Sequence, residues 1–242
     1  MRSCTVVPCG DSAVTAVFPG GISAENTERV RALSAALEKR RIAGVTGTIP
    51  AYSSLTVCYD PLRLSGTRIA RIVGRLAERT QTAKAERKTV HLIPVLYGGA
   101  YGEDLPFVAR RAGLSCGEAA ALHAGTDYLI HMIGFLPGFA YLGGLDGRLA
   151  APRLDSPRTV IPAGSVGIGG GQTGIYPVSS PGGWRLIGRT PLRMYDPDRD
   201  PPVLYRPGEY IRFVPVDESA FAEMERAAGA GTVRWEVREE TV

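Results

Sequence analysis

The segment Ile133–Pro197, with the sequence IGFLPGFAYLGGLDGRLAAPRLDSPRTVIPAGSVGIGGGQTGIYPVSSPGGWRLIGRTPLRMYDP, decides the kind of fold that this chain of 242 residues adopts. Glycine and proline recur every few residues, and short apolar runs such as Thr159–Ile161 and Trp184–Ile187 stand between them. Because both residue types interrupt helices, no long helix spans the segment. It is too apolar and too aromatic for a disordered linker. Ordered loops around short strands remain, and such loops commonly carry ligand-binding groups.

The overall composition excludes several classes of protein. Hydrophobic residues make up 44% and charged residues 21% of the chain, which is ordinary for a soluble globular protein. The sequence has no run of about 18 apolar residues, so no membrane span is expected, and the first residues lack the apolar core of a signal peptide. The net charge is +4 without any block of five basic residues, so no nucleic-acid-binding arm is expected.

Cysteine and histidine spacings do not indicate a metal site. The chain has four cysteines and three histidines, and none of them forms a C-x-x-C pair or another zinc-ligand spacing. We therefore expect reduced thiols, a cytoplasmic protein and no intrinsic metal ion.

Residues 1–84 predict a small N-terminal α+β domain, which we assign as ferredoxin-like. Ser23 is suited to cap a helix that reaches about Arg40, and the spacing of Ile69, Val73 and Leu76 gives a second helix one apolar face. We expect strands at 4–8, 13–18, 45–49 and 55–59, and helices at 23–40 and 67–79. This order favours two layers, with the helices on one face of an antiparallel sheet.

The polar stretch 80–88 is the expected linker, and residues 85–242 are the expected second domain. Residues 103–124 predict a helical hairpin, with Gly113 at the turn and a capping box formed by Ser115 and Glu118. The same stretch is similar to a DNA-binding helix-turn-helix. Its second helix, however, offers mainly small side chains, so we favour a structural hairpin.

From Tyr128 onward the pattern predicts a closed or sandwiched β-fold. The apolar runs are short, and turn residues separate them. We expect strands at 128–133, 159–161, 165–168, 184–188, 192–195 and 210–214, followed by a helix at 219–228 and a last strand at 232–237.

The string Gly169–Gly174 matches the nucleotide-binding pattern G-x-G-x-x-G by letter only. That motif needs a helix directly after it, and Pro177 and Pro181 prevent one. A P-loop is also excluded in the C-terminal half, because no lysine follows Lys88.

The glycine-rich segment supplies groups that suit a small, polar ligand. Ser165, Gln172 and Ser180 offer hydrogen bonds, while glycines allow close approach of backbone N–H groups. Arginines can hold a carboxylate or phosphate in a bidentate manner; the candidates are Arg158, Arg185 and Arg189. Aromatic side chains could wall a small pocket; these are Phe135, Phe139, Tyr141 and Tyr176.

Several long strings of this chain resemble the family of 5-oxoprolinase B subunits, which is also described as allophanate hydrolase subunit 1 or as KipI-type. The resemblance covers nearly the whole chain. It is carried by Gly10–Ala13, Pro50–Leu55, Pro94–Gly98, Ile133–Leu145, Pro162–Pro177, Ser180–Trp184 and Ile187–Leu192.

The resemblance implies a C-terminal cyclophilin-like β-barrel after the small N-terminal domain. It also implies subunits C and A as partners in an ATP-dependent 5-oxoprolinase, with Mg²⁺-ATP bound at the level of the complex, and a chain that is inactive alone. By position, the implied ligand-facing residues are Ser165, Gln172, Tyr176, Ser180, Gly182, Gly183 and Arg189. We hypothesise that Arg189 stabilises developing charge and that Gln172 orients the amide.

Two other functions remain open at this point. KipI-type members inhibit a sporulation histidine kinase, which requires a protein-binding surface and no turnover. A related module serves in urea or allophanate pathways as a carboxyltransferase-like subunit that depends on biotin. The polar, glycine-rich segment favours the enzyme over the kinase inhibitor, because inhibition does not need it.

Overall fold

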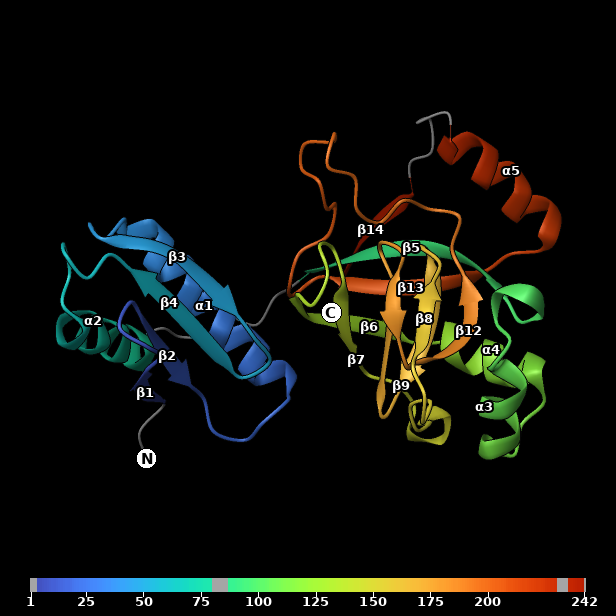
Figure 1. The fold of residues 1–242 in the computed structure, drawn as a ribbon, viewed down its shortest axis with the longest axis horizontal. Helices are drawn as coiled ribbons and strands as arrows, with labels where there is room; N and C mark the ends of the chain where they lie inside the picture. Colours follow the sequence, from blue (N-terminus) through green and yellow to red (C-terminus); the bar gives the residue numbers. More distant parts are fainter. Residues whose placement is uncertain (1–3, 80–86, 230–234, 242) are drawn as a thin grey trace. The chain divides into compact units, whose positions relative to one another are not determined.

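The computed structural model describes residues 4–79, 87–229 and 235–241. The chain divides into two compact units, residues 1–85 and 86–242, which are drawn in Figure 1. Most of the predicted linker, 80–86, lies outside the described residues, and its last two residues, Arg87 and Lys88, begin a strand.

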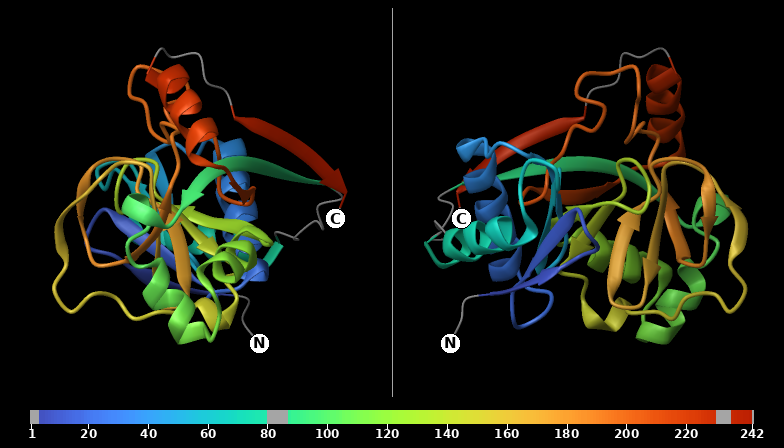
Figure 2. Two further views of the ribbon diagram at one scale, coloured as in Figure 1. Left: turned by 90° about the vertical axis from the view of Figure 1, so that its right-hand side faces the viewer. Right: turned by 60° about the vertical axis from the view of Figure 1, so that its left-hand side comes forward.

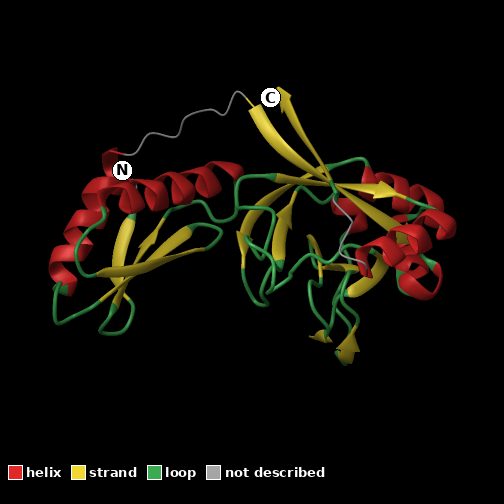
Figure 3. Cartoon of the chain, turned by 90° about the horizontal axis from the view of Figure 1, so that it is seen from above, coloured by secondary structure: helices red, strands yellow, loops and turns green. Residues whose placement is uncertain are grey.

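The first unit is an antiparallel sheet with the strand order β1-β2-β4-β3 and two helices on one face, as Figure 3 shows. The two-layer arrangement predicted from the sequence is confirmed. Its elements are β1 Thr5–Pro8, β2 Ala13–Val17, α1 Ala24–Arg40, β3 Val45–Pro50, β4 Ser54–Tyr59 and α2 Gly66–Arg79.

Capping and apolar spacing explain the helices of this unit. The Ser23 hydroxyl accepts a hydrogen bond from the backbone N–H of Asn26 at 3.1 Å, which satisfies one free donor at the start of α1. Leu33 from α1 and Ile69 from α2 are fully buried against Leu55 and Val57 of β4. The helices therefore cover the sheet through the side chains that the periodicity indicated.

The ferredoxin-like assignment is not confirmed. A ferredoxin-like domain has the order β-α-β-β-α-β, whereas this unit has β-β-α-β-β-α. The short turn at Gly10 allows β1 and β2 to pair directly as a hairpin, with Val7 opposite Thr15. No crossover helix separates the first two strands, so the topology differs.

The second unit is a closed barrel of seven strands. Its order is β12-β9-β10-β7-β6-β13-β5, and the ring closes because β12 also pairs with β5. The strands are β5 Arg87–Tyr97, β6 Asp127–Ile133, β7 Ala140–Gly143, β9 Ser165–Gly169, β10 Gln172–Ile175, β12 Arg185–Arg189 and β13 Tyr210–Pro215.

Further elements surround this barrel. Figure 2 shows β14, Glu236–Thr241, running beside the first half of β5, and the ribbon of β8 Arg158–Ile161 and β11 Ser180–Gly182 forms a separate two-stranded sheet. The predicted helical hairpin is present as α3 Leu105–Ala112 and α4 Cys116–Ala124, with Gly113 in the left-handed conformation and the Ser115–Glu118 capping box. The remaining elements are η1 Gly99–Tyr101, η2 Gly147–Leu149 and α5 Glu218–Gly229.

Two predicted strands are corrected. Residues 192–195 form an irregular loop with one isolated bridge from Tyr195 to Val203, since Pro191 has no N–H and the Leu192 N–H bonds the Thr190 hydroxyl at 3.3 Å. The last strand, predicted at 232–237, covers 236–241 in the structure, and residues 232–234 of the prediction lie outside the described residues.

His123 lies at the centre of a polar network inside the barrel and is fully buried. Its Nε2 lies 2.8 Å from the Thr173 hydroxyl, which donates to the Gly167 carbonyl at 3.0 Å. The hydroxyl has one proton, so His123 Nε2 must carry the proton of the first bond. Burial lowers the pKa of His123 to about 3, so the ring is neutral near pH 7 and its Nδ1 accepts from the Tyr97 hydroxyl at 2.7 Å.

We expect His123 to make the protein less stable in mild acid. Below pH 6.5 the unfolded chain binds a proton at this side chain, whereas the folded chain does not until about pH 3. The free energy of unfolding therefore falls with decreasing pH across this window, by up to ~1.4 kcal/mol per pH unit from this group. Urea unfolding should show that the free energy of unfolding falls between about pH 7 and about pH 5, and that this fall is ~2 kcal/mol smaller in His123→Gln than in the wild type. Equal losses in the two proteins would contradict this assignment.

Candidate functional site

The glycine-rich segment lies on the outer face of the barrel. Along β9 the side chains alternate, so Val166 and Ile168 enter the barrel core while Gly167 and Gly169 face outward. Gly174 of β10 lies on the same outer face, because it pairs with Gly167. Three residues without a side chain thus form a flat surface.

Trp184 covers this flat surface. A Cβ at Gly169 would overlap the indole Nε1, and a Cβ at Gly174 would lie 3.2 Å from the indole and 3.1 Å from the Phe139 ring. Phe139 meets the indole edge-on at 5.5 Å between centroids and meets Tyr176 at 5.6 Å. The glycines therefore serve packing here, and the chain's own side chains fill the space where we expected a small ligand pocket.

The predicted aromatic wall is mostly part of this cluster. Phe139 and Tyr176 are each 2% exposed, and half-buried Tyr141 lies edge-on to Phe139 at 5.0 Å. Phe135 differs, because 67% of it is exposed although its ring touches the edge of Phe139.

Arg189, Ser165 and Tyr176 lie together at one end of β9. Arg189 pairs with Ser165 in the ladder, and the Tyr176 N–H donates to the Ser165 carbonyl at 2.9 Å. The Arg189 Nε donates to the Ala163 carbonyl at 3.0 Å, and its guanidinium lies 5.7 Å from the centroid of the Tyr101 ring. Three residues that the sequence predicted for the site are thus brought to one place.

Gln172 lies at the other end of β9, where it pairs with Gly169. Ser165 and Gly169 are four positions apart on one strand, which is ~13 Å. The bond from Arg189 to Ala163 holds the guanidinium still farther from that end. Our expectation that Arg189 and Gln172 act on one small amide is therefore not supported by the register of the sheet.

The other two candidate arginines are neutralised within the chain. The buried carboxylate of Asp104 accepts from Arg158 at 2.9 Å and pairs with Arg185 at 3.4 Å. The same carboxylate accepts from the Leu186 backbone N–H at 2.8 Å. In the described part of the chain no carboxylate forms such a pair with Arg189, so this guanidinium is the one left to meet an anion.

The predicted residues of β11 lie close to Tyr176. Ser180 is 8% exposed, and its hydroxyl is the one buried side-chain oxygen or nitrogen among the described residues without a hydrogen-bond partner. A Cβ at Gly182 would lie 2.5 Å from the Tyr176 hydroxyl, and half-buried Gly183 accepts from the Leu154 N–H at 2.7 Å. An unpaired buried hydroxyl costs ~1–3 kcal/mol, so Ser180 offers a ligand or a water an unused hydrogen bond.

Sequence reasoning missed Asp104, Tyr101 and Trp184. Asp104 precedes a helix with proline in its first turn, which is typical of an N-cap, yet its side chain makes no capping bond and binds the two arginines instead. Only the register of distant strands shows these roles.

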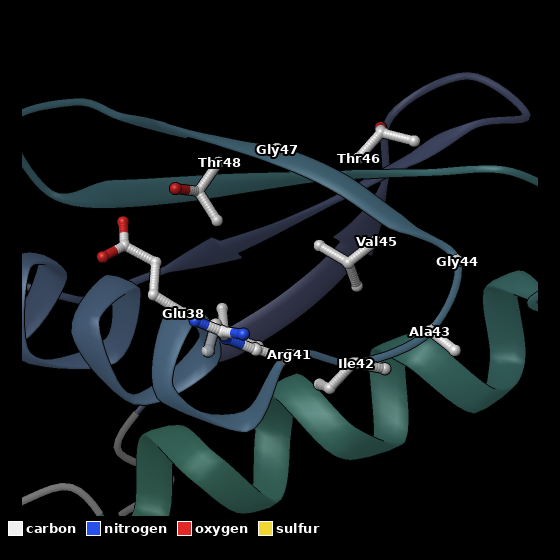
Figure 4. Close-up of a pocket in the computed structure, with 10 residues that line it drawn as sticks. Glu38, Arg41, Ile42, Ala43, Gly44, Val45, Thr46, Gly47 and Thr48 are labelled. Atoms are coloured by element: carbon white, nitrogen blue, oxygen red, sulfur yellow. The ribbon is translucent and has the colours of Figure 1, made fainter.

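Hollows occur elsewhere on each unit. Figure 4 shows a hollow on the first unit, where Glu38 and Arg41 lie across from Val45 and Thr48 of β3; its volume is about 400 Å³. It arises where Arg41 ends α1 in a left-handed conformation and the chain crosses to the sheet. On the second unit, hollows of about 430 Å³ and 770 Å³ lie beside the Gly98–Gly102 turn and between α5 and the strands β5 and β13.

The described residues contain neither a membrane-spanning helix nor a cluster of metal ligands. None of the described helices is long and apolar enough to cross a membrane. No three histidine, cysteine or acidic side chains of those residues gather as metal ligands would.

Comparison with known proteins relates the chain to one group. The family model for the carboxyltransferase domain, subdomain C and D, matches residues 4–205. The chain is 44% identical over 223 residues to the 5-oxoprolinase B subunit of Bacillus subtilis (strain 168), covering 88% of this chain and 92% of that one. It is 41% identical over 210 residues to the 5-oxoprolinase B subunit of Escherichia coli O157:H7, covering 86% and 94%.

Solved structures agree with the fold. The crystal structure of TTHA0988 has a TM-score of 0.75 and 40% identity; the match covers 85% of this chain but only 40% of the longer TTHA0988 chain. PH0987 from Pyrococcus horikoshii has a TM-score of 0.54 and 46% identity, with 90% and 100% covered. Kluyveromyces lactis urea carboxylase has a TM-score of 0.81 over 98% of this chain and 24% of its own, and its 18% identity relates the folds alone.

Gly169→Ala should displace Trp184, whereas Gly171→Ala should not. A methyl group at Gly169 overlaps the indole, while a Cβ at Gly171 has nothing within 4 Å. We expect Gly169→Ala to lower the free energy of unfolding by ~1–3 kcal/mol and to shift the tryptophan emission. Gly171→Ala should stay within ~0.5 kcal/mol of the wild type. In the Trp184→Ala background the cost of Gly169→Ala should largely disappear, and an unchanged cost would contradict the packing argument.

Proposed function

Because this chain belongs to the carboxyltransferase-domain family that contains the 5-oxoprolinase B subunits, we propose that it is the B subunit of an ATP-dependent 5-oxoprolinase. With subunits A and C, the complex would open the lactam of 5-oxo-L-proline to L-glutamate. The observation that carries the proposal is the 37–44% identity to three 5-oxoprolinase B subunits, over 86–88% of this chain. The four free thiols fit a cytoplasmic complex.

Arg189 is the residue of this chain best suited to bind the substrate. The substrate carries a carboxylate, and charge develops on the lactam oxygen when water attacks the carbonyl carbon. Nε of Arg189 is fixed by the Ala163 carbonyl, which leaves the terminal nitrogens of the guanidinium for such an anion. The unpaired Ser180 hydroxyl supplies a further hydrogen bond from the β8–β11 ribbon, where Ser180 pairs with Ile161, two residues before Ala163.

Net opening of the lactam is a hydrolysis. The carbonyl carbon gains oxygen from water, the C–N bond breaks, and the nitrogen takes up a proton. We assign Arg189 to the oxygen on which charge accumulates, or to the substrate carboxylate. We do not assign Gln172 to the same substrate atoms, because it pairs with Gly169 at the end of β9 opposite to Arg189.

The glycine-rich turn of this chain does not fit a nucleotide. Gly169 and Gln172 are joined by a hairpin, so the turn leads into the strand β10 rather than into a helix, and no lysine follows Lys88. We therefore propose that ATP and Mg²⁺ bind to another subunit of the complex. This division agrees with a chain that is inactive alone.

Substitution of Arg189 tests the proposal in the reconstituted complex of all three subunits. We expect Arg189→Ala to lower kcat/KM for glutamate release by about 100-fold, because one charged hydrogen-bond donor to the reacting group is lost. Arg189→Lys should recover part of the loss if charge alone matters. Arg193→Ala is the matched control, since its side chain is 63% exposed and pairs only at 3.7 Å with Asp196.

Other outcomes separate the alternatives. Undiminished turnover by Arg189→Ala would exclude the residue from the site. If the wild-type complex does not hydrolyse the lactam, the proposed function is wrong. Inhibition of a histidine kinase without turnover, or turnover that requires biotin, would favour the KipI-type or the urea and allophanate alternative.

A further inference from the structure

Phe135 is exposed to an unusual degree. Phe135 is 67% exposed, and it is the only aromatic residue in the exposed class among the described residues. Apart from its edge contact with Phe139 at 5.7 Å, the ring is left to solvent. Because so little of its apolar surface is buried, this side chain contributes little to the free energy of folding.

The backbone of Phe135 is also strained. Its φ is +68°, in the left-handed region that glycine occupies readily and a residue with a Cβ does not. A non-glycine residue in this conformation costs ~1–2 kcal/mol. Glycines are nearby at Gly134 and Gly138, but the strained position itself holds phenylalanine.

Hydrogen bonds hold the loop around Phe135 in one shape. The Gly134 N–H donates to the Phe139 carbonyl at 3.0 Å, and the Phe139 N–H donates to the Leu136 carbonyl at the same distance. The Tyr205 hydroxyl donates to the Gly138 carbonyl, and a Cβ at Gly138 would lie 3.1 Å from Tyr195. The loop is thus a fixed support that presents one aromatic ring outward.

From the exposed ring, the strained backbone and the fixed loop, we propose that Phe135 is the anchor through which this chain docks onto its partner subunit. The inference rests on the proposed function, which supplies a partner. A rigid aromatic side chain that enters an apolar pocket is the usual form of an interface hot spot, because little entropy is lost on binding. Within the described chain, the one ring that Phe135 meets is Phe139, and this edge contact leaves most of the side chain exposed.

The longer relative indicates which partner this is. A region similar to this chain makes up 40% of the TTHA0988 chain, whereas the B subunits of Bacillus subtilis and Escherichia coli are covered over 92% and 94% of their length. The same domain thus occurs both joined to a further segment and as a separate subunit. The occupant we commit to is the subunit that corresponds to the rest of the TTHA0988 chain.

The position of Phe135 agrees with a shared site. Its loop follows Ile133 of β6, which pairs with Ala140 of β7. The Ala140 carbonyl lies next to Gly174 of β10, the neighbour of Ile175. Ile175 pairs with Val166, the neighbour of Ser165 in β9, and Ser165 pairs with Arg189. Phe135 and Arg189 therefore lie at the same end of the barrel, where a docked subunit would complete the Arg189 site.

The test measures the affinity of the full-length chain for that subunit by calorimetry. The variants are Phe135→Ala and Phe135→Gly, with Leu62→Ala as a matched control, because Leu62 is 96% exposed and lies in the first unit. We expect both Phe135 variants to bind about 30-fold more weakly and Leu62→Ala to bind like the wild type. Phe135→Gly should melt within a few degrees of the wild type, since glycine accepts the left-handed conformation.

The outcomes distinguish this inference from the proposed function. Weaker binding by Phe135 variants whose melting temperature is unchanged supports the anchor. This holds even if the wild-type complex does not hydrolyse 5-oxoproline, a result that would contradict the proposed function alone. An active complex in which Phe135→Ala and Phe135→Gly bind with unchanged affinity overturns the anchor alone. Absence of wild-type binding, or a Phe135 effect only on self-association of the chain in sedimentation, also overturns it.

Discussion

Closure of the barrel rests on a short contact between β5 and β12. Only Tyr97 with Gly188 and Leu96 with Arg189 pair across it. A Cβ at Gly188 would lie 2.7 Å from Val95 and 2.8 Å from the Leu96 carbonyl, so glycine is required for this approach. The carboxylate of Asp104 reinforces the contact, since it binds the Leu186 N–H and the two arginines. Because Arg189 belongs to the closing pair, the same contact that completes the fold also places the candidate ligand-binding guanidinium.

Local signals in the sequence were sufficient for the helices and for much of the strand pattern. The Ser23 cap, the Ser115–Glu118 capping box and the left-handed Gly113 follow from residues within one turn of one another. The strands β7, β10 and β11 were not predicted, because each is three or four residues long and all of them contain glycine or proline. Neighbouring strands, rather than their own composition, keep these segments extended.

The candidate residues could be named from the sequence, but the contacts that their side chains make could not. The three candidate arginines look alike in the sequence, and only Asp104, which is 54 and 81 residues away from Arg158 and Arg185, separates those two from Arg189. Likewise, the glycine string resembles a ligand loop until the indole of Trp184 is found on it. Such contacts depend on strand register, which composition and spacing do not encode.

The pairing of β14 with β5 has a consequence for handling the protein. β14 covers the Arg87–Leu92 part of β5 and presents an outer edge with charged, mostly exposed side chains. If the chain were cut before Glu236, the bare backbone of β5 beside buried Val90 and Leu92 would become the free edge. Unpaired edges next to apolar strands recruit other chains, so the shortened protein would aggregate during concentration and storage.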